Sequence, residues 1–249
     1  MRKQLYRRLT KELQRRLPQA NKAQVRNQAL LTQALVFSDN CHLPNLALEL
    51  PLGGQRENLI QRLRRFLDNY RVEPRVYYDP LVRQMLAQWP DREVNLVMDR
   101  TDIGQEKSIL LLAVAFKYRA IPLSWRVLPF GGTGEALQVA LLKAIQPYLP
   151  SGKRVMFYGD SEFRAVGLQC YCRQQGWGWQ VGVKSDTLFH QGDENWQPLS
   201  TLAVKRGERC YRHNLILTQH DPFGPVSLML DWTYEGDTPR YVVCHRPTN

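Results

Sequence analysis

Between residues 94 and 184 the sequence holds five short apolar segments whose spacing changes along the chain. The first three are close enough to be joined by short turns, and they cover residues 94–98, 109–116 and 121–129. The last two, residues 154–158 and 179–184, each follow a helical pattern, at residues 134–149 and 165–175. Short links permit an antiparallel meander, whereas helical crossovers add parallel strands. This order, β-β-β-α-β-α-β, predicts an α/β fold built on a mixed sheet.

The N-terminal 70 residues are predicted to form short helices. Leu5, Leu9 and Leu13 recur at a spacing of four, with Arg and Lys between them. The stretch "LIQRLRRFL", residues 59–67, has the pattern of an amphipathic helix. Pro and Gly in "HLPNLALELPLGG" break the helical pattern before it. Short helices with a basic last member are typical of a DNA-binding bundle. The alternative is a bundle whose arginines are only solvated.

Breaks in these patterns divide the chain into four segments. Residues 1–70 form the helical domain, and residues 71–92 form a proline-containing connector with room for one short helix. Residues 93–188 contain the α/β core. Residues 189–249 are strand-like, with Gly, Pro and Asp at the expected turns, and form a β-rich region after the core.

Positive charge is concentrated at the N-terminus of the chain. The net charge is +11, and residues 1–89 hold 16 Lys and Arg against 7 Asp and Glu. The remaining residues hold 18 against 16. A one-sided basic segment predicts a polyanionic partner, and nucleic acid is favoured over an anionic membrane. The predicted DNA-binding residues are Arg56, Arg62, Arg64, Arg65, Arg206 and Arg209. Lys205 and Arg212 could join the last two, or all four could line a solvated hairpin.

The sequence gives no sign of membrane insertion or secretion. Its longest apolar run, residues 109–116, has eight residues, whereas a membrane-spanning helix needs about 20. No apolar segment of a signal peptide follows the basic N-terminus. The five cysteines form no C-x-x-C pair, which fits reduced thiols. We therefore expect a cytoplasmic protein with no membrane partner.

Two aspartates follow apolar segments of the predicted sheet. Asp99 ends the first segment, and Asp160 lies just past the fourth. If these strands are neighbours, both carboxylates reach one edge of the sheet, where a divalent cation would offset their repulsion. Mg²⁺ prefers such oxygen ligands and can activate a nucleophile for phosphodiester displacement. The alternative is local: Asp160 could cap the helix near Ala165, and Asp99 could form an Asx turn.

Other polar and aromatic residues nearby are weaker candidates. Glu162 could assist a metal, but a surface or capping role is favoured. Asp102 is close to Asp99 in sequence and is expected to face a turn. Trp196 and Trp232 could stack on an unpaired base, although such residues are more often part of a core.

Two of these stretches resemble motifs of a known family. "NLVMDRTD", with Asp99, and "FYGDSEF", with Asp160, resemble the two aspartate motifs of bacterial insertion-sequence transposases of the DDE class. The resemblance is to the cut-and-paste group that carries a Tyr-Arg-Glu-Lys signature. "HLPNLALELP" and "ENLIQRLRRFLDN" resemble the N-terminal DNA-binding region of that group, and "AIPLSWRVLP" resembles its third strand.

This resemblance implies a fold, a reaction and partners. The core would be ribonuclease H-like, with residues 189–249 as a β-rich insertion. Asp99 and Asp160 would be catalytic ligands of Mg²⁺ or Mn²⁺. The DNA partners would be the terminal inverted repeats of the transposon and the target, cut and joined in the bacterial cytoplasm. A second copy of the chain or a full-length transposase would be a further partner.

The chain departs from the family at the third acidic ligand, a Glu on a later helix. No Tyr in the sequence has Arg three positions after it, and Tyr241 is followed there by Cys244. Glu235 and Asp237 lie in the turn-like "YEGDTP", so neither is promoted to that role. We therefore expect a transposase without its C-terminal part, through truncation, a split or frameshifted element, or fragmentation. Two aspartates alone would bind one metal weakly.

Three functions follow from these features. The first is a transposase with impaired catalysis. The alternative is a non-catalytic DNA-binding fragment that occupies transposon ends or inhibits the full-length enzyme. A generic ribonuclease H-like nuclease is less favoured because of the N-terminal resemblance.

Overall fold

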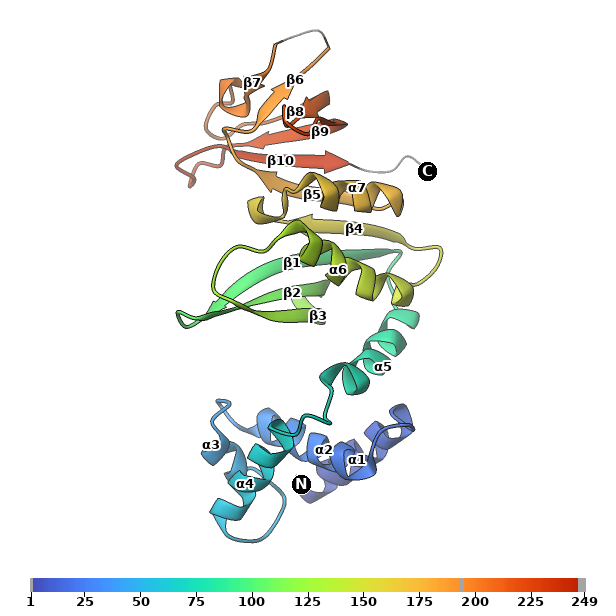
Figure 1. The fold of residues 1–249 in the computed structure, drawn as a ribbon. Coiled ribbons are helices and arrows are strands. Elements are labelled where there is room, and N and C mark those ends of the chain that lie inside the picture. The colour runs from blue at the N-terminus through green and yellow to red at the C-terminus, as the bar shows by residue number, and fades with distance from the viewer. Residues whose placement is uncertain (1, 193–194, 246–249) are drawn as a thin grey trace. The chain divides into compact units, whose positions relative to one another are not determined.

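The computed structural model describes residues 2–192 and 195–245, and the chain divides into two compact units (Figure 1). The N-terminal unit extends to Leu86, and the C-terminal unit begins at Ala87. Residue 1 of the expected helical domain lies outside the described residues, as do 193–194 and 246–249 of the expected β-rich region.

The N-terminal unit is helical, as the sequence predicts. Its helices are α1 (Arg2–Arg16), α2 (Lys22–Phe37), α3 (Leu43–Leu48), α4 (Arg56–Leu67) and α5 (Pro74–Ala87). Asn21 caps α2 because its side chain accepts hydrogen bonds from the backbone N–H groups of Ala23 and Gln24. Pro44 lies in the first turn of α3, where a missing N–H has no cost.

Two clusters of apolar side chains hold these helices together. The larger one joins α2, α3 and α4 through Leu30, Ala34, Leu46, Leu50 and Leu63. The smaller one joins the end of α1 to α2 and α5 through Leu17, Val25 and Tyr77. No side chain within α1 itself is fully buried, so its leucine stripe is only partly covered.

Most of the expected connector, residues 71–92, is helical. Residues 74–87 form the helix α5, with Pro74 in its first turn and Pro80 inside it. Tyr77, Val82 and Leu86 are buried, because the apolar positions of this segment recur at helical spacing. The segment is therefore an ordered helix that contributes Tyr77 to the N-terminal core.

The C-terminal unit contains one ten-stranded sheet. The expected core supplies β1 (Glu93–Ile103), β2 (Lys107–Phe116), β3 (Arg119–Pro129), β4 (Arg154–Gly159) and β5 (Gly178–Val183). The β-rich region supplies β6 (Leu188–His190), β7 (Gln197–Pro198), β8 (Arg209–Leu217), β9 (Phe223–Asp231) and β10 (Arg240–His245). Helix α6 (Glu135–Ile145) precedes β4, and α7 (Val166–Gln174) precedes β5.

The strand order is β3-β2-β1-β4-β5-β10-β9-β8-β6-β7. The first three strands form an antiparallel meander, and β4 and β5 are parallel to β1, which confirms the predicted mixed α/β sheet. The β-rich region does not form a layer of its own. Strand β10 pairs antiparallel with β5, so the same sheet continues into β9 and β8.

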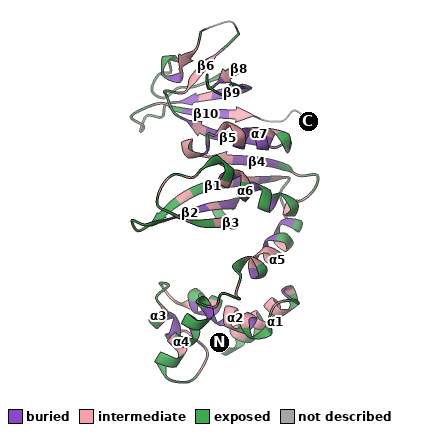
Figure 2. Cartoon of the chain, viewed as in Figure 1, coloured by how far each residue is buried: buried purple, intermediate pink, exposed green. Residues whose placement is uncertain are grey.

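The two α-helices of this unit lie on the same face of the sheet (Figure 1). The indole N–H of Trp179 on β5 donates to the side-chain oxygen of Gln169 on α7 at 3.0 Å, which identifies this face. Trp179 pairs with Phe157, and Phe157 pairs with Leu96, so all three point toward the helices. Their neighbours Val97, Tyr158 and Gln180 point to the opposite face and are only half-buried. Figure 2 shows buried and half-buried stretches along these central strands.

Candidate functional site

Asp99 and Asp160 lie at matching positions on adjacent parallel strands. Val97 on β1 pairs with Tyr158 on β4, and each aspartate is two residues further along its strand direction. Because side chains alternate along a strand, both carboxylates point away from the helix-covered face. Both residues are exposed. The tertiary structure thus brings together two acids that the sequence separates by a meander and a helix.

Both aspartates line one open groove on that face, with a volume of about 1110 Å³. Its floor is mostly apolar and includes Val97, Leu111 and Ala113, and Arg240 lies at its rim. Strand β5 contributes Gln180 and Gly182. The groove therefore presents two carboxylates beside an apolar surface.

The local alternatives for the two aspartates have different outcomes. Asp160 is the N-cap of the 3₁₀ turn Ser161–Phe163, where its carboxylate accepts the N–H of Glu162 at 2.8 Å, rather than the cap of α7. Asp99 forms no Asx turn, because it lies within β1 opposite Leu111. Only one carboxylate oxygen of Asp160 takes part in the cap. The carboxylate of Asp99 forms no hydrogen bond with the described residues.

Glu162 joins three segments that converge beside Asp160. Its carboxylate accepts the guanidinium Nε of Arg100 at 2.9 Å. It also accepts the backbone N–H and the hydroxyl of Thr133, at 3.1 and 2.7 Å. Arg100 in turn donates to the carbonyl of Gly131 at 2.7 Å. The end of β1, the loop before α6 and the turn after β4 are thus tied together, and the predicted surface or capping role of Glu162 is wrong.

The hydrogen bonds of this network shift the pKa values of Glu162 and Arg100. Burial pushes the pKa of Glu162 up, but the hydrogen bonds from Thr133 and Arg100 outweigh it and bring the pKa below its ordinary value. The hydrogen bond to Glu162 raises the pKa of Arg100, and the nearby carboxylates of Asp102 and Asp160 raise it further. Arg100 and Glu162 are therefore both charged at neutral pH and form a fixed ion pair.

The other acids considered in the sequence do not line the groove. Asp102 lies in β1 opposite Ser108, whose hydroxyl donates to its carboxylate at 2.8 Å, so it does not face a turn. Glu235 and Asp237 lie in the turn between β9 and β10, as expected. Within residues 2–192 and 195–245, no three His, Cys, Asp or Glu side chains lie close enough together to hold a metal ion.

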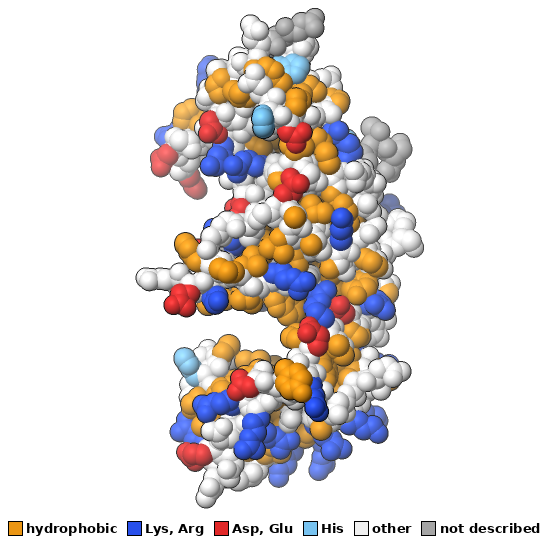
Figure 3. All heavy atoms as spheres, in the orientation of Figure 1, with side chains coloured by type: hydrophobic (Ala, Val, Ile, Leu, Met, Phe, Trp, Pro, Cys, Tyr) orange, Lys and Arg blue, Asp and Glu red, His pale blue; other side chains and the backbone are white. Residues whose placement is uncertain are grey.

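The arginines predicted to bind DNA fall into two groups in the N-terminal unit. Arg56 donates to the carbonyl of Pro44 at 3.1 and 3.3 Å, and Arg62 donates to the side-chain oxygen of Asn27 at 2.9 Å. Arg64 and Arg65 are exposed, and neither has an ion pair or side-chain hydrogen bond with the described residues. Lys and Arg side chains gather over the helices of this unit in Figure 3.

The arginines predicted in the β-rich region are more constrained. Arg209 pairs with Asp231 at 3.0 Å, and Arg240 pairs with the other oxygen of Asp231 at 2.5 Å. Arg206 donates to the carbonyl of Gly236 at 3.0 Å and covers the ring of Trp232. The indole of Trp232 donates to the same carbonyl. Trp196 contacts His190 edge to face, so both tryptophans have intramolecular partners.

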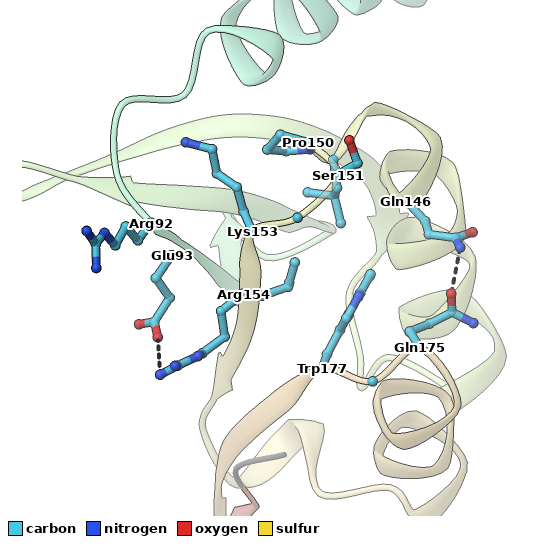
Figure 4. A pocket seen from close by; sticks show the side chains of 13 residues that line it. Arg92, Glu93, Gln146, Pro150, Ser151, Lys153, Arg154, Gln175 and Trp177 are labelled. Carbon is cyan, nitrogen blue, oxygen red and sulfur yellow. Dashed lines mark hydrogen bonds and ion pairs between the residues drawn. The ribbon is translucent and has the colours of Figure 1, made fainter. Parts of the chain in front are cut away.

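A second pocket, of about 970 Å³, lies at the other ends of β1 and β4 (Figure 4). The ammonium group of Lys153 donates to the carbonyls of Trp89 and Asp91, at 2.5 and 2.7 Å. Arg154 pairs with Glu93 at 3.7 Å. These cations hold strand ends together, and the pocket lies away from Asp99 and Asp160.

Comparisons with known proteins bear on the fold. The sequence matches no protein-family model, and no curated protein is significantly similar to it. The structure resembles that of piggyBac transposase in its synaptic complex with hairpin DNA, with a TM-score of 0.50 and 13% sequence identity. The match covers 92% of this chain and 53% of that one, so the chain spans about half the length of the solved transposase. The likeness indicates a transposase-like fold.

A further solved structure, Marinitoga piezophila Argonaute with guide RNA and target DNA, has a TM-score of only 0.31 and 8% identity. The match covers 84% of this chain and 32% of the Argonaute chain. No helix in the described part of the chain is both long and apolar enough to cross a membrane.

Sequence reasoning missed Arg100 and Thr133. Arg100 directly follows Asp99 in the motif, but its partner Glu162 is 62 residues away. Thr133 lies in the Gly-rich loop before α6, which looked like an ordinary turn. The one available signal was the opposite charge of Arg100 and Glu162 beside two aspartates that were expected to meet.

Proposed function

We propose that the chain is a DNA transposase that binds the terminal inverted repeats of an insertion sequence and acts by metal-dependent strand cleavage and transfer. The observation that carries the proposal is the register of the adjacent parallel strands β1 and β4, which puts the carboxylates of Asp99, within β1, and Asp160, just past the end of β4, in one groove. The transposase-like fold and the β-β-β-α-β-α-β order support a ribonuclease H-like core over residues 93–188.

The residues in the groove fit a divalent cation. Both acids are exposed carboxylates, and at least one oxygen of each is not used by a described protein donor. Such hard oxygen donors suit Mg²⁺ or Mn²⁺. When bound, the ion would supply an activated water and stabilise the leaving oxygen of the phosphodiester.

The chain's own residues would position this site and its substrate. The Arg100–Glu162 pair holds the turn that carries Asp160 against the end of β1. Phosphates would be held by the basic helical domain, residues 1–70, and by Arg206 and Arg209 in the β-rich insertion, residues 189–249. Residues 71–92 would connect the helical domain to the core.

The alternative is a DNA-binding protein without catalysis that occupies transposon ends or pairs with a full-length enzyme. The observation that favours it is that no group of three metal-binding side chains occurs among the described residues. Two carboxylates would bind a cation weakly, because the remaining positions would be filled by water. In either function we place the protein in the bacterial cytoplasm, as a homodimer or with that longer partner.

A cleavage assay tests the two functions. The full chain is incubated with duplexes taken from the DNA on both sides of its coding region, with Mg²⁺ or Mn²⁺ and with EDTA. A transposase should nick a strand at one defined position, only with the metal. Asp99→Ala and Asp160→Ala should each abolish the nick. Asp91→Ala, an exposed aspartate near the opposite end of β1, should cleave like the wild type.

The outcomes separate the proposals. Metal-dependent nicking that disappears in both groove variants supports catalysis and rejects the non-catalytic alternative. Binding of the end duplexes without nicking supports the alternative. Absence of binding to any duplex rejects both.

A further inference from the structure

Helices α2 and α4 border a small polar groove of about 330 Å³ on the N-terminal unit. Asn58, Arg62 and Arg65 lie along one side of α4 at steps of four and three residues, so they share a helix face. Asn69 continues the row just past the end of α4, and Gln24 and Asn27 line the groove from α2. Phe66 is buried beneath them. The groove is thus lined by amides and guanidinium groups over an apolar base.

A hydrogen bond anchors the side chain of Arg62 in this groove. Its Nε donates to the side-chain oxygen of Asn27 at 2.9 Å, across the gap between the two helices. This bond uses one of the five donors of the guanidinium group, and the two terminal nitrogens stay available for another partner. Arg65, one turn further along, has no such partner among the described residues and can follow a flexible phosphate.

We propose that the α2–α4 groove reads base edges in the major groove of duplex DNA, with Arg62 as the reader and Asn27 as the residue that orients it. The inference rests on the proposed DNA binding. It assigns base contacts to one of the predicted arginines, Arg62, and phosphate contacts to another, Arg65. An orientated guanidinium group matches the O6 and N7 acceptors of guanine, and an asparagine such as Asn58 matches the N6 and N7 of adenine. Arg65 contacts phosphate and carries no sequence preference.

The chemistry of the groove favours duplex DNA over other polyanions. Positive charge alone would be enough to attract a membrane surface or an acidic peptide. In this groove, uncharged amide side chains alternate with the arginines. Amide groups contribute little to attraction at a distance but discriminate between donor and acceptor patterns at contact. In A-form RNA the major groove is too narrow for side chains to enter, so an RNA duplex should fit poorly.

The test uses the full chain and a pool of random-sequence duplexes. The bound sequences are selected and enriched, and affinities are then measured for the enriched duplex and a scrambled one at a single salt concentration. Arg62→Lys and Asn27→Ala should each lower the ratio of the two affinities by about 5-fold to 150-fold. Affinity for the scrambled duplex should change by less than about 2-fold, because Arg62→Lys keeps the charge and Asn27→Ala does not alter it.

Two further variants serve as controls. Arg119→Lys, at an exposed position of the C-terminal unit, should leave the ratio unchanged, and Arg65→Ala should weaken both duplexes equally. Thermal unfolding monitors whether Asn27→Ala is folded, and Arg62→Lys tests the inference independently.

Each other outcome overturns the inference. An unchanged ratio in both groove variants would show that the preference is read elsewhere. Binding without any enriched sequence would refute base reading while the proposed DNA binding stands. Tighter binding to an RNA duplex of the same sequence would point to another partner. Absence of binding to all duplexes would remove the proposed function as well.

Discussion

At the scale of single residues, Glu162 connects the candidate site to the rest of the core. Its carboxylate is three-quarters shielded, with 23% of the side chain exposed, and it bonds to Arg100 and Thr133. These bonds tie the turn after β4 to β1 through Arg100 and to the loop before α6 through Thr133. Asp160 depends on the same turn, because it accepts the backbone N–H of Glu162.

Replacing the charge of Glu162 should therefore change stability in a pH-dependent way. Its pKa in the folded chain lies below the ordinary 4.5, so its contribution is fully present above pH 4.5 and is lost as the pH falls through the folded pKa. Glu162→Gln should cost about 1.5 to 3 kcal/mol at pH 7, the size of a hydrogen bond to a charged group. The difference from the wild type should shrink toward pH 3, as measured by urea unfolding.

A matched control is Asp91→Asn, which changes an exposed acid on the same unit and should follow the wild-type pH profile within about 0.5 kcal/mol. If Glu162→Gln lowered the free energy of unfolding by the same amount at every pH, the stabilisation would come from the packing of the side chain and not from its ion pair with Arg100.

At the scale of elements, β5 and the turn after β4 approach more closely than side chains would allow. A Cβ atom at Gly182 would lie 3.0 Å from the backbone N of Ser161 and 3.2 Å from the carbonyl carbon of Asp160. Both neighbours are backbone atoms, which cannot rotate away. The absence of a side chain at Gly182 is thus one of the conditions that set the position of Asp160.

Gly182→Ala should displace this turn. We expect the free energy of unfolding to fall by about 1 to 3 kcal/mol, the usual cost of overpacking. If Asp160 is a metal ligand, affinity for Mn²⁺, measured by electron paramagnetic resonance, should fall as well. Gly53→Ala, where a Cβ would meet nothing within 4 Å, should leave both quantities unchanged. An unperturbed Gly182→Ala protein would show that the turn moves freely.

At the scale of the whole molecule, charge is divided unevenly between the two units. The N-terminal unit holds 16 Lys and Arg against 7 Asp and Glu, and the C-terminal unit holds 18 against 16. Binding to phosphates releases counterions from DNA, so a basic unit that binds DNA must lose affinity steeply with salt. The C-terminal unit adds little net charge and should contribute less to this dependence.

The double variant Arg64→Ala/Arg65→Ala tests this division. The slope of log affinity against log salt for non-specific duplex DNA should become shallower by about 2, close to one unit for each phosphate that the variant no longer neutralises. Lys107→Ala/Arg119→Ala removes the same charge from exposed positions of the C-terminal unit and should leave the slope unchanged. Equal effects of the two double variants would indicate that net charge alone sets the binding.

Local patterns in the sequence were enough to predict most of the helices and strands and to single out Asp99 and Asp160. Periodicity located most of the helices and strands of residues 93–183 to within a few residues, because Gly, Pro and buried apolar runs act locally. The exception is β1, which continues five residues past its predicted end at residue 98. The sequence also predicted that the carboxylates of Asp99 and Asp160 would reach one edge of the sheet if their strands were neighbours, and the strand order makes β1 and β4 neighbours.

How those elements pair, and which side chains surround the two aspartates, followed from the three-dimensional fold. The β-rich region extends the core sheet through β10 because hydrogen bonding between strands β5 and β10 is non-local and leaves no periodic trace. Glu162 meets Arg100 across 62 residues and Thr133 across 29, and Arg62 meets Asn27 across 35. Strand register and packing determine which residues meet at such separations. Neither the register nor the packing can be read from a short stretch of the sequence.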